Sequence, residues 1–182
     1  MTGVQTCALP IFTAHPFIAD ASVTRRLPGT YRIEVHEQQP AALLQLEALY
    51  LVSEEGAVLK RLGPGDPVDL PVITGVDAVQ FRADLALRTS LLVNAMALLH
   101  DYRDAGLWRR EPVAEIHAEG GDGFTLYIGQ DAMLVRLGDR PFRKKLHRLR
   151  GILDELGSDA ARPAYVYLDN VRRPDRVAVR LR

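Results

Sequence analysis

Residues 113–156 read VAEIHAEGGDGFTLYIGQDAMLVRLGDRPFRKKLHRLRGILDEL, and this stretch decides the fold. Its first part alternates apolar and polar residues in three short runs, which is typical of half-buried strands. These runs are residues 113–118, 123–129 and 132–137. Short segments with Gly and Asp separate them, so we expect an antiparallel meander. Residues 140–156 then place apolar side chains every three to four positions, which predicts an amphipathic helix. A meander followed by a helix indicates an α+β fold.

The same patterns extend to both sides of this stretch. Residues 83–105 predict a second helix, which Gly106 would end, and Asp139 and Gly157 are the expected caps of helix 140–156. Residues 17–26 and 30–37 predict a hairpin, in which Tyr31, Ile33 and Val35 would form the buried face. Further strands are expected at 48–53, 57–61, 72–75, 164–169 and 175–181.

The predicted fold class is therefore α+β. A hairpin comes first, and a mixed β domain with about seven strands and two helices follows it. Residues 38–47, which contain Pro40, are the expected junction between the two.

The charge of the chain is balanced overall but polarised along its length. The 182 residues include 23 basic and 23 acidic ones, so the formal net charge is zero. Residues 139–182 hold 12 basic and 6 acidic residues, a net of +6, and residues 1–138 hold the balancing −6. The zero total does not suggest a generally basic nucleic-acid binder, whereas the basic end is either a partner surface or a solvated face.

The first eleven residues, MTGVQTCALPI, do not read as part of a domain. They lack the basic and apolar regions of a signal peptide, and they match the translation of a common sequencing-adapter oligonucleotide. We therefore treat residues 1–11 as an artefact and expect the natural chain to have a different, longer N-terminus that runs into Phe12. Cys7, the only cysteine, falls in this segment, so no internal disulfide is possible.

A search for catalytic or metal chemistry finds no constellation. The sequence has no phosphate-binding glycine loop and no nucleophile elbow, and none of its five histidines lies three or four residues from another. Glu115, Glu119 and Asp122 are expected on the solvated face and turn of a hairpin. We therefore predict no enzyme activity, no cofactor and no metal site.

Two basic segments remain as candidate binding surfaces. Helix 140–156 carries a basic face that could meet phosphate or an anionic membrane, although no aromatic residues interleave with it for base stacking. Its members are Arg140, Arg143, Lys144, Lys145, Arg148 and Arg150. The last strand is more informative, since Val177, Val179 and Leu181 are expected to face a core. Arg176, Ala178, Arg180 and Arg182 would face outward, as in a protected edge or a strand-addition site.

Several segments together resemble one family of bacterial division proteins, FtsQ/DivIB. Residues 22–41, SVTRRLPGTYRIEVHEQQPA, resemble the final hairpin of its POTRA domain. Residues 48–74 resemble the start of its β domain, with a Leu-Val-Ser-x-x-Gly-x-Val hairpin and a stretch from Leu70 to Gly75. Residues 132–149 resemble its strand, Leu-Gly turn and helix. One departure is that many relatives have a segment of Asp-Leu-Arg-Tyr type in the penultimate strand, whereas here Leu168-Asp169-Asn170 follows Tyr167.

The resemblance implies three segments: the artefact at 1–11, a truncated POTRA domain at 12–43 and an FtsQ-type β domain at 44–182. It implies a non-enzymatic divisome scaffold, held in the inner membrane by a single helix absent from this sequence, with these domains on the periplasmic side at the septum. The implied partners are FtsB- and FtsL-type proteins. The partner-binding strand would comprise Arg176, Val177, Ala178, Val179, Arg180, Leu181 and Arg182.

Two alternatives remain open at this point. The chain could belong to another POTRA-containing module for envelope assembly or secretion, which a POTRA repeat or a membrane barrel would identify. It could also be a nucleic-acid or membrane-surface binder that uses the basic face of helix 140–156.

Overall fold

The computed structural model describes residues 15–26, 28–120, 123–157, 162–170, 173 and 176–181. Residues 1–11 with Cys7, Leu27 of the first turn, Asp122 of the meander and Arg182 therefore lie outside the described residues. The described part confirms the α+β class, with one large mixed sheet, a separate hairpin and three helices.

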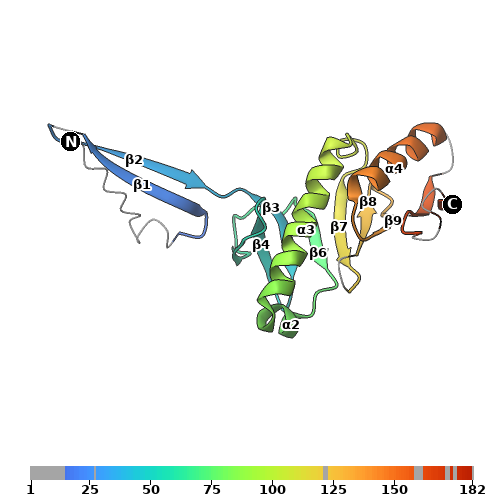
Figure 1. Ribbon diagram of the computed structural model, residues 1–182, viewed down its shortest axis with the longest axis horizontal. Helices are drawn as coiled ribbons and strands as arrows, with labels where there is room; N and C mark the ends of the chain where they lie inside the picture. Colours follow the sequence, from blue (N-terminus) through green and yellow to red (C-terminus); the bar gives the residue numbers. More distant parts are fainter. Residues whose placement is uncertain are drawn as a thin grey trace.

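The hairpin consists of β1 (Ile18–Arg26) and β2 (Thr30–Glu37), which pair only with each other. It projects away from the large sheet (Figure 1). Tyr31, Ile33 and Val35 share one face as expected, but they are 62%, 51% and 40% exposed rather than half-buried. The alternation of β2 predicts the side on which they lie, but no described element packs over that face.

The large sheet has nine strands in the order β11-β10-β9-β8-β7-β6-β3-β4-β5. Its strands are β3 (Pro40–Gln45), β4 (Leu49–Ser53), β5 (Val58–Arg61), β6 (Val72–Thr74), β7 (Val113–Ala118), β8 (Phe124–Ile128), β9 (Met133–Gly138), β10 (Pro163–Tyr167) and β11 (Ala178–Leu181). The expected meander is β7-β8-β9, and its neighbours pair in antiparallel fashion. β10 lies parallel to β9, and β6 lies parallel to both β3 and β7.

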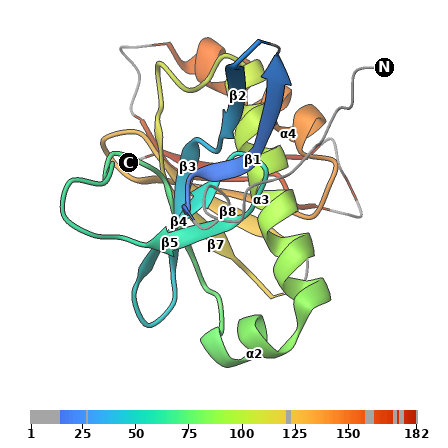
Figure 2. The same cartoon turned by 90° about the vertical axis from the view of Figure 1, so that its left-hand side faces the viewer.

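The structure describes three helices, α2 (Ala78–Ala83), α3 (Leu85–Asp104) and α4 (Phe142–Leu156). Helices α3 and α4 lie on one side of the sheet, and α2 lies at its lower end (Figure 2). One hydrophobic cluster joins the inner faces of α3 and α4 to the sheet, including Leu99, Leu146 and Leu149. We call the opposite side, which no described helix covers, the open face of the sheet.

Three details differ from the sequence predictions. Residues 38–47 were expected as a junction, but they contain strand β3, which is buried and pairs with both β4 and β6. The helix predicted at 83–105 is confirmed as α3, but a short helix that was not predicted, α2, precedes it. Asp84 ends α2, and its carboxylate caps α3 by accepting from the Leu87 amide. The N-cap of α4 is Pro141, without a side-chain hydrogen bond, rather than Asp139.

Candidate interaction edge of the sheet

The strand β11 forms one edge of the nine-stranded sheet. Among the described strands it pairs only with β10, antiparallel, with Ala178 opposite Tyr167, Val179 opposite Val166 and Arg180 opposite Tyr165. The outer side of its backbone therefore has no described strand beside it. Of the other predicted binding residues, Arg176 and Val177 directly precede β11.

A continuous apolar row crosses the sheet and ends at this edge. Register partners place one residue of each of seven strands in line, as follows: Leu44, Ile73, Ile116, Leu126, Val135, Val166 and Val179. The first six are 0% exposed, whereas Val179 is 40% exposed. The row is thus a buried layer of the core whose last member faces solvent.

This exposure corrects the prediction that Val177, Val179 and Leu181 face a core. Val177 is partly buried and packs against the core cluster, but Leu181 is 48% exposed. The physical reason is position in the sheet, because an edge strand has a neighbour on one side only. Arg176, Ala178 and Arg180 are exposed, as expected.

The open face beside β11 carries a pair of stacked tyrosines. Tyr165 and Tyr167 alternate with the buried Val166, so both rings lie on the open face. Their ring centroids are 4.6 Å apart and the rings are inclined by 20°. Their register partners on β11 are Arg180 and Ala178, so an apolar, aromatic strip adjoins the edge on this side.

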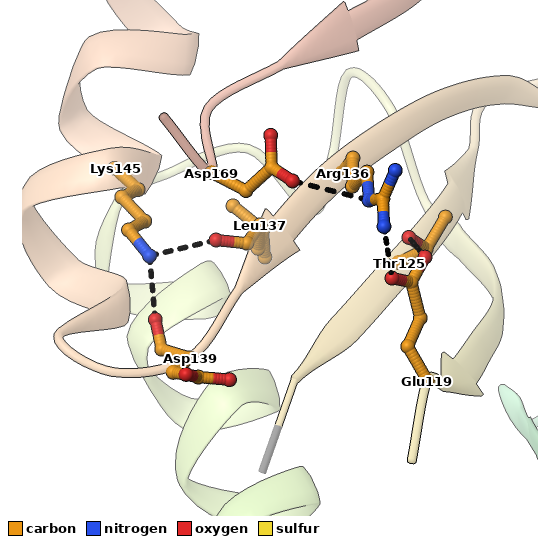
Figure 3. Close-up of polar contacts among 7 residues, drawn as sticks. All are labelled: Glu119, Thr125, Arg136, Leu137, Asp139, Lys145 and Asp169. Atoms are coloured by element: carbon orange, nitrogen blue, oxygen red, sulfur yellow. Dashed lines mark hydrogen bonds and ion pairs between the residues drawn. The ribbon is translucent and has the colours of Figure 1, made fainter. Parts of the chain in front are cut away.

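Ion pairs tie the end of β10 to the meander (Figure 3). The Arg136 guanidinium on β9 lies 3.1 Å from the Asp169 carboxylate, which follows β10, and 2.8 Å from the Glu119 carboxylate after β7. Thr125 Oγ1 also donates to Glu119. This hydrogen bond, with the Arg136 guanidinium, holds the pKa of Glu119 below its ordinary value, although partial burial opposes the shift. The network fixes the chain where it leaves β10 toward β11.

A lysine fixes the start of α4 in the same region. Lys145 Nζ donates to the carbonyl oxygens of Leu137, at 2.7 Å, and Asp139, at 2.5 Å (Figure 3). Burial lowers the pKa of Lys145, while the carboxylates of Asp139 and Asp169 oppose that shift. Lys145 therefore acts as a tether between α4 and the end of β9, not as an exposed cation of the basic face.

The other polar residues singled out in the sequence lie further from the edge. Glu115 and His117 on β7 both contact Thr74 on β6, whose Oγ1 lies 2.9 Å from His117 Nδ1 and donates to Glu115. Over the residues that the structure covers, no group of three His, Cys, Asp or Glu side chains could hold a metal ion. Likewise, no helix in the described part is long and apolar enough to cross a membrane.

The sequence reasoning missed two features of this edge. The tyrosine stack was detectable, because Tyr165 and Tyr167 are two residues apart in a predicted strand and must share a face. The Arg136–Asp169 pair was not, because it depends on the parallel pairing of β9 with β10 across an intervening helix.

Comparison with known proteins gives a consistent result. A family model described as "Cell division protein FtsQ/DivIB, C-terminal" matches residues 42–170. The cell division protein FtsQ of Anaeromyxobacter sp. (strain K) is 41% identical over 92% of this chain and 56% of its own length. FtsQ of Myxococcus fulvus is 36% identical, over 92% of this chain and 58% of that protein. FtsQ of Geobacter sp. (strain M21) is 35% identical, over 85% and 57% respectively. The chain thus spans a little over half the length of these curated relatives.

Proposed function

Because the chain belongs to the FtsQ/DivIB family of cell division proteins, we propose that it acts as a non-enzymatic scaffold of the bacterial divisome. It binds FtsB- and FtsL-type partners by strand addition at β11 and so supports septal cell-wall synthesis. The binding residues are Arg176 and Val177, the strand Ala178–Leu181, and Arg182.

The observation that carries this proposal is the apolar row that ends at Val179. An added strand on the outer side of β11 would place its own side chain next to Val179 and continue a layer that is otherwise buried. Backbone hydrogen bonds supply affinity in strand addition, and alternate side-chain contacts supply specificity. The two faces of the sheet at β11 offer an added strand different contacts. Val179 lies on the helix side, and the tyrosine strip lies with Arg180 on the open face.

We also propose where these domains lie in the cell envelope. The hairpin β1–β2 is the end of a POTRA domain, and the sheet that begins with β3 is the β domain. The boundary expected between residues 43 and 44 moves to before Pro40, because β3 pairs with β4 and β6. Both domains lie on the periplasmic side of the inner membrane, at the septum, in a protein anchored by a single membrane helix. The family match and the relatives named as cell division proteins support this assignment.

A proline at position 179 tests strand addition. Val179→Pro removes a backbone donor and introduces a ring into the ladder, so we expect binding of the FtsB homologue from the same genome to be abolished. Val179→Ala is the matched control, because it shortens the side chain but keeps the amide. Circular dichroism must show both variants folded, and unchanged affinity in the folded proline variant would refute the proposal.

A second variant tests the charge of the edge. Arg180→Glu places a carboxylate beside Tyr165, where we expect it to weaken binding of an acidic partner segment and to reduce the salt dependence of the affinity. The measurement is titration calorimetry at two ionic strengths. An unaltered salt dependence would show that Arg180 does not face partner charge.

A further inference from the structure

A basic groove adjoins the predicted binding edge on the helix side of the sheet. It has a volume of about 340 Å³ and lies between α4 and the segment Leu168–Asn170 that follows β10. Four cations line it, Arg140, Lys144, Lys145 and Arg148. The Lys145 ammonium already donates to the Leu137 and Asp139 carbonyls, so the other three are the groove's binding cations. Four-residue spacing places Lys144 and Arg148 on the same face of α4, one turn apart, and Arg140 precedes the helix by two residues.

The carboxylates nearest the groove are engaged elsewhere. Asp169 also lines the groove, but its carboxylate is paired with the Arg136 guanidinium at 3.1 Å. The Asp139 carboxylate is directed toward the start of β8, where a side-chain carbon at Gly123 would lie 3.1 Å from its Oδ1. Lys144 is exposed and has no ion pair among the described residues. The groove therefore presents net positive charge.

The groove also has an apolar component that suits a peptide side chain. The Arg140 guanidinium lies 5.8 Å from the ring centroid of Phe142, and Pro141 lines the groove next to Arg140. The opposite wall contains Leu168. A pocket with aliphatic walls and cationic heads is complementary to a Glu or Asp side chain carried by an extended segment.

Two hydrogen bonds among described residues lie between the groove and β11. Asn170 Oδ1 accepts a hydrogen bond of 2.9 Å from the Arg173 amide, and the Arg176 amide donates to the Arg173 carbonyl at 2.9 Å. The groove wall at Leu168–Asn170 directly follows Tyr167, the register partner of Ala178 at the first position of β11. A strand paired with β11 therefore has one of its ends beside this groove.

We infer that the groove is a second contact for the same partner, and that it takes an acidic residue flanking the strand that pairs with β11. This inference rests on the proposed function, because it assigns a chemistry to the segment that continues the added strand. The occupant is an Asp- or Glu-bearing peptide segment, with its carboxylate between Arg140 and Lys144.

Charge reversal on α4 tests the inference, and the helix supplies its own control. Lys144→Glu reverses a groove cation, whereas Arg143→Glu reverses an exposed cation one residue away that does not line the groove. Both variants change the net charge equally. With the periplasmic segment of the FtsB homologue as probe, we expect Lys144→Glu to weaken binding on the order of five- to tenfold and Arg143→Glu by less than about twofold.

The outcomes separate this inference from the proposed function. Equal losses for the two variants would show a long-range effect of net charge and would overturn the groove assignment. No loss for Lys144→Glu, together with lost binding for Val179→Pro, would overturn the groove assignment and leave strand addition standing. Unchanged binding for both Lys144→Glu and a folded Val179→Pro would overturn both.

A vesicle assay tests whether the groove binds anionic lipid instead of an acidic peptide segment. Vesicles of phosphatidylglycerol and phosphatidylethanolamine are sedimented with the wild-type chain and with Lys144→Glu. Release of the variant from vesicles, with partner affinity unchanged, would make the groove a membrane contact and would refute the inference.

Discussion

A substitution at Gly75 tests how closely the end of β6 packs against β7. Gly75 follows β6, ends the Leu70–Gly75 stretch, and has a φ of +76°. A side-chain carbon there would lie 2.4 Å from the Ala118 carbonyl oxygen and 2.8 Å from His117 Cε1. Gly75→Ala therefore faces both an unfavourable backbone conformation and a collision with the neighbouring strand β7.

The expected loss in free energy of unfolding is the sum of these two effects. Left-handed backbone costs a non-glycine residue about 1–2 kcal/mol, and overpacking against a fixed backbone adds about 1–3 kcal/mol. Gly65→Ala is the matched control, because Gly65 has a φ of +86° but nothing within 4 Å of the added carbon. We expect Gly75→Ala to lower the free energy of unfolding by about 2–5 kcal/mol and Gly65→Ala by about 1–2 kcal/mol.

Equilibrium urea unfolding, followed by circular dichroism, measures both variants. For a chain of this size, each kcal/mol corresponds to a change of about 2–4 °C in Tm, so a thermal scan gives an independent value. Gly75→Asn separates the two terms, because Asn tolerates left-handed backbone but still carries the colliding carbon. If Gly75→Ala cost no more than Gly65→Ala, the collision with β7 would be refuted.

Three further variants test the core and the network beside the edge. Thr125→Val removes the hydrogen bond that does most to lower the pKa of Glu119. A lowered carboxyl pKa contributes stability that is lost as pH falls through the folded-state value, so we expect the midpoint of acid unfolding to move to higher pH, and Thr125→Ser to restore it. Leu149→Ala, at a site that is 0% exposed, should cost about 2–5 kcal/mol in urea unfolding, against less than about 1 kcal/mol for Val93→Ala, whose side chain is 46% exposed. Tyr102→Phe leaves a buried backbone carbonyl without its 2.6 Å hydrogen bond and should cost about 1–3 kcal/mol, and an unchanged unfolding midpoint would contradict that hydrogen bond.

Periodicity predicted the elements that have one buried face. The alternation in 113–137 and the leucine spacing in 140–156 each record a buried side and a solvated side, and the structure places those elements within a few residues of the prediction. Strand β3 was not predicted, because Ala41–Leu44 is a continuous apolar run without alternation, which is typical of a strand inside a sheet. Pro40 favours a junction at 38–47, but proline is also tolerated at the first position of a strand, which is where β3 has it.

Sequence patterns identified the side of each edge residue but not its exposure. The alternation in β11 correctly places Val179 on the core side, since Val179 is the register partner of the buried Val166. Exposure depends on whether another strand lies beyond β11, and alternation within one strand carries no information about its neighbours. The same argument applies to Tyr31 and Ile33 in β2, whose shared face is also exposed.

The apolar row separates the residues that stabilise the fold from those proposed to bind a partner. Val166 and Val179 have the same side chain and lie opposite each other, but Val166 is 0% exposed and Val179 is 40% exposed. Truncating Val166 to alanine removes buried contacts on both sides, so its effect falls on unfolding. Truncating Val179 to alanine removes contacts on one side only. Most of its effect should therefore appear in the affinity for the added strand, not in the free energy of unfolding. A double-mutant cycle between Val179 and its neighbour on that strand would therefore show coupling in binding, whereas Val166 would couple chiefly to stability.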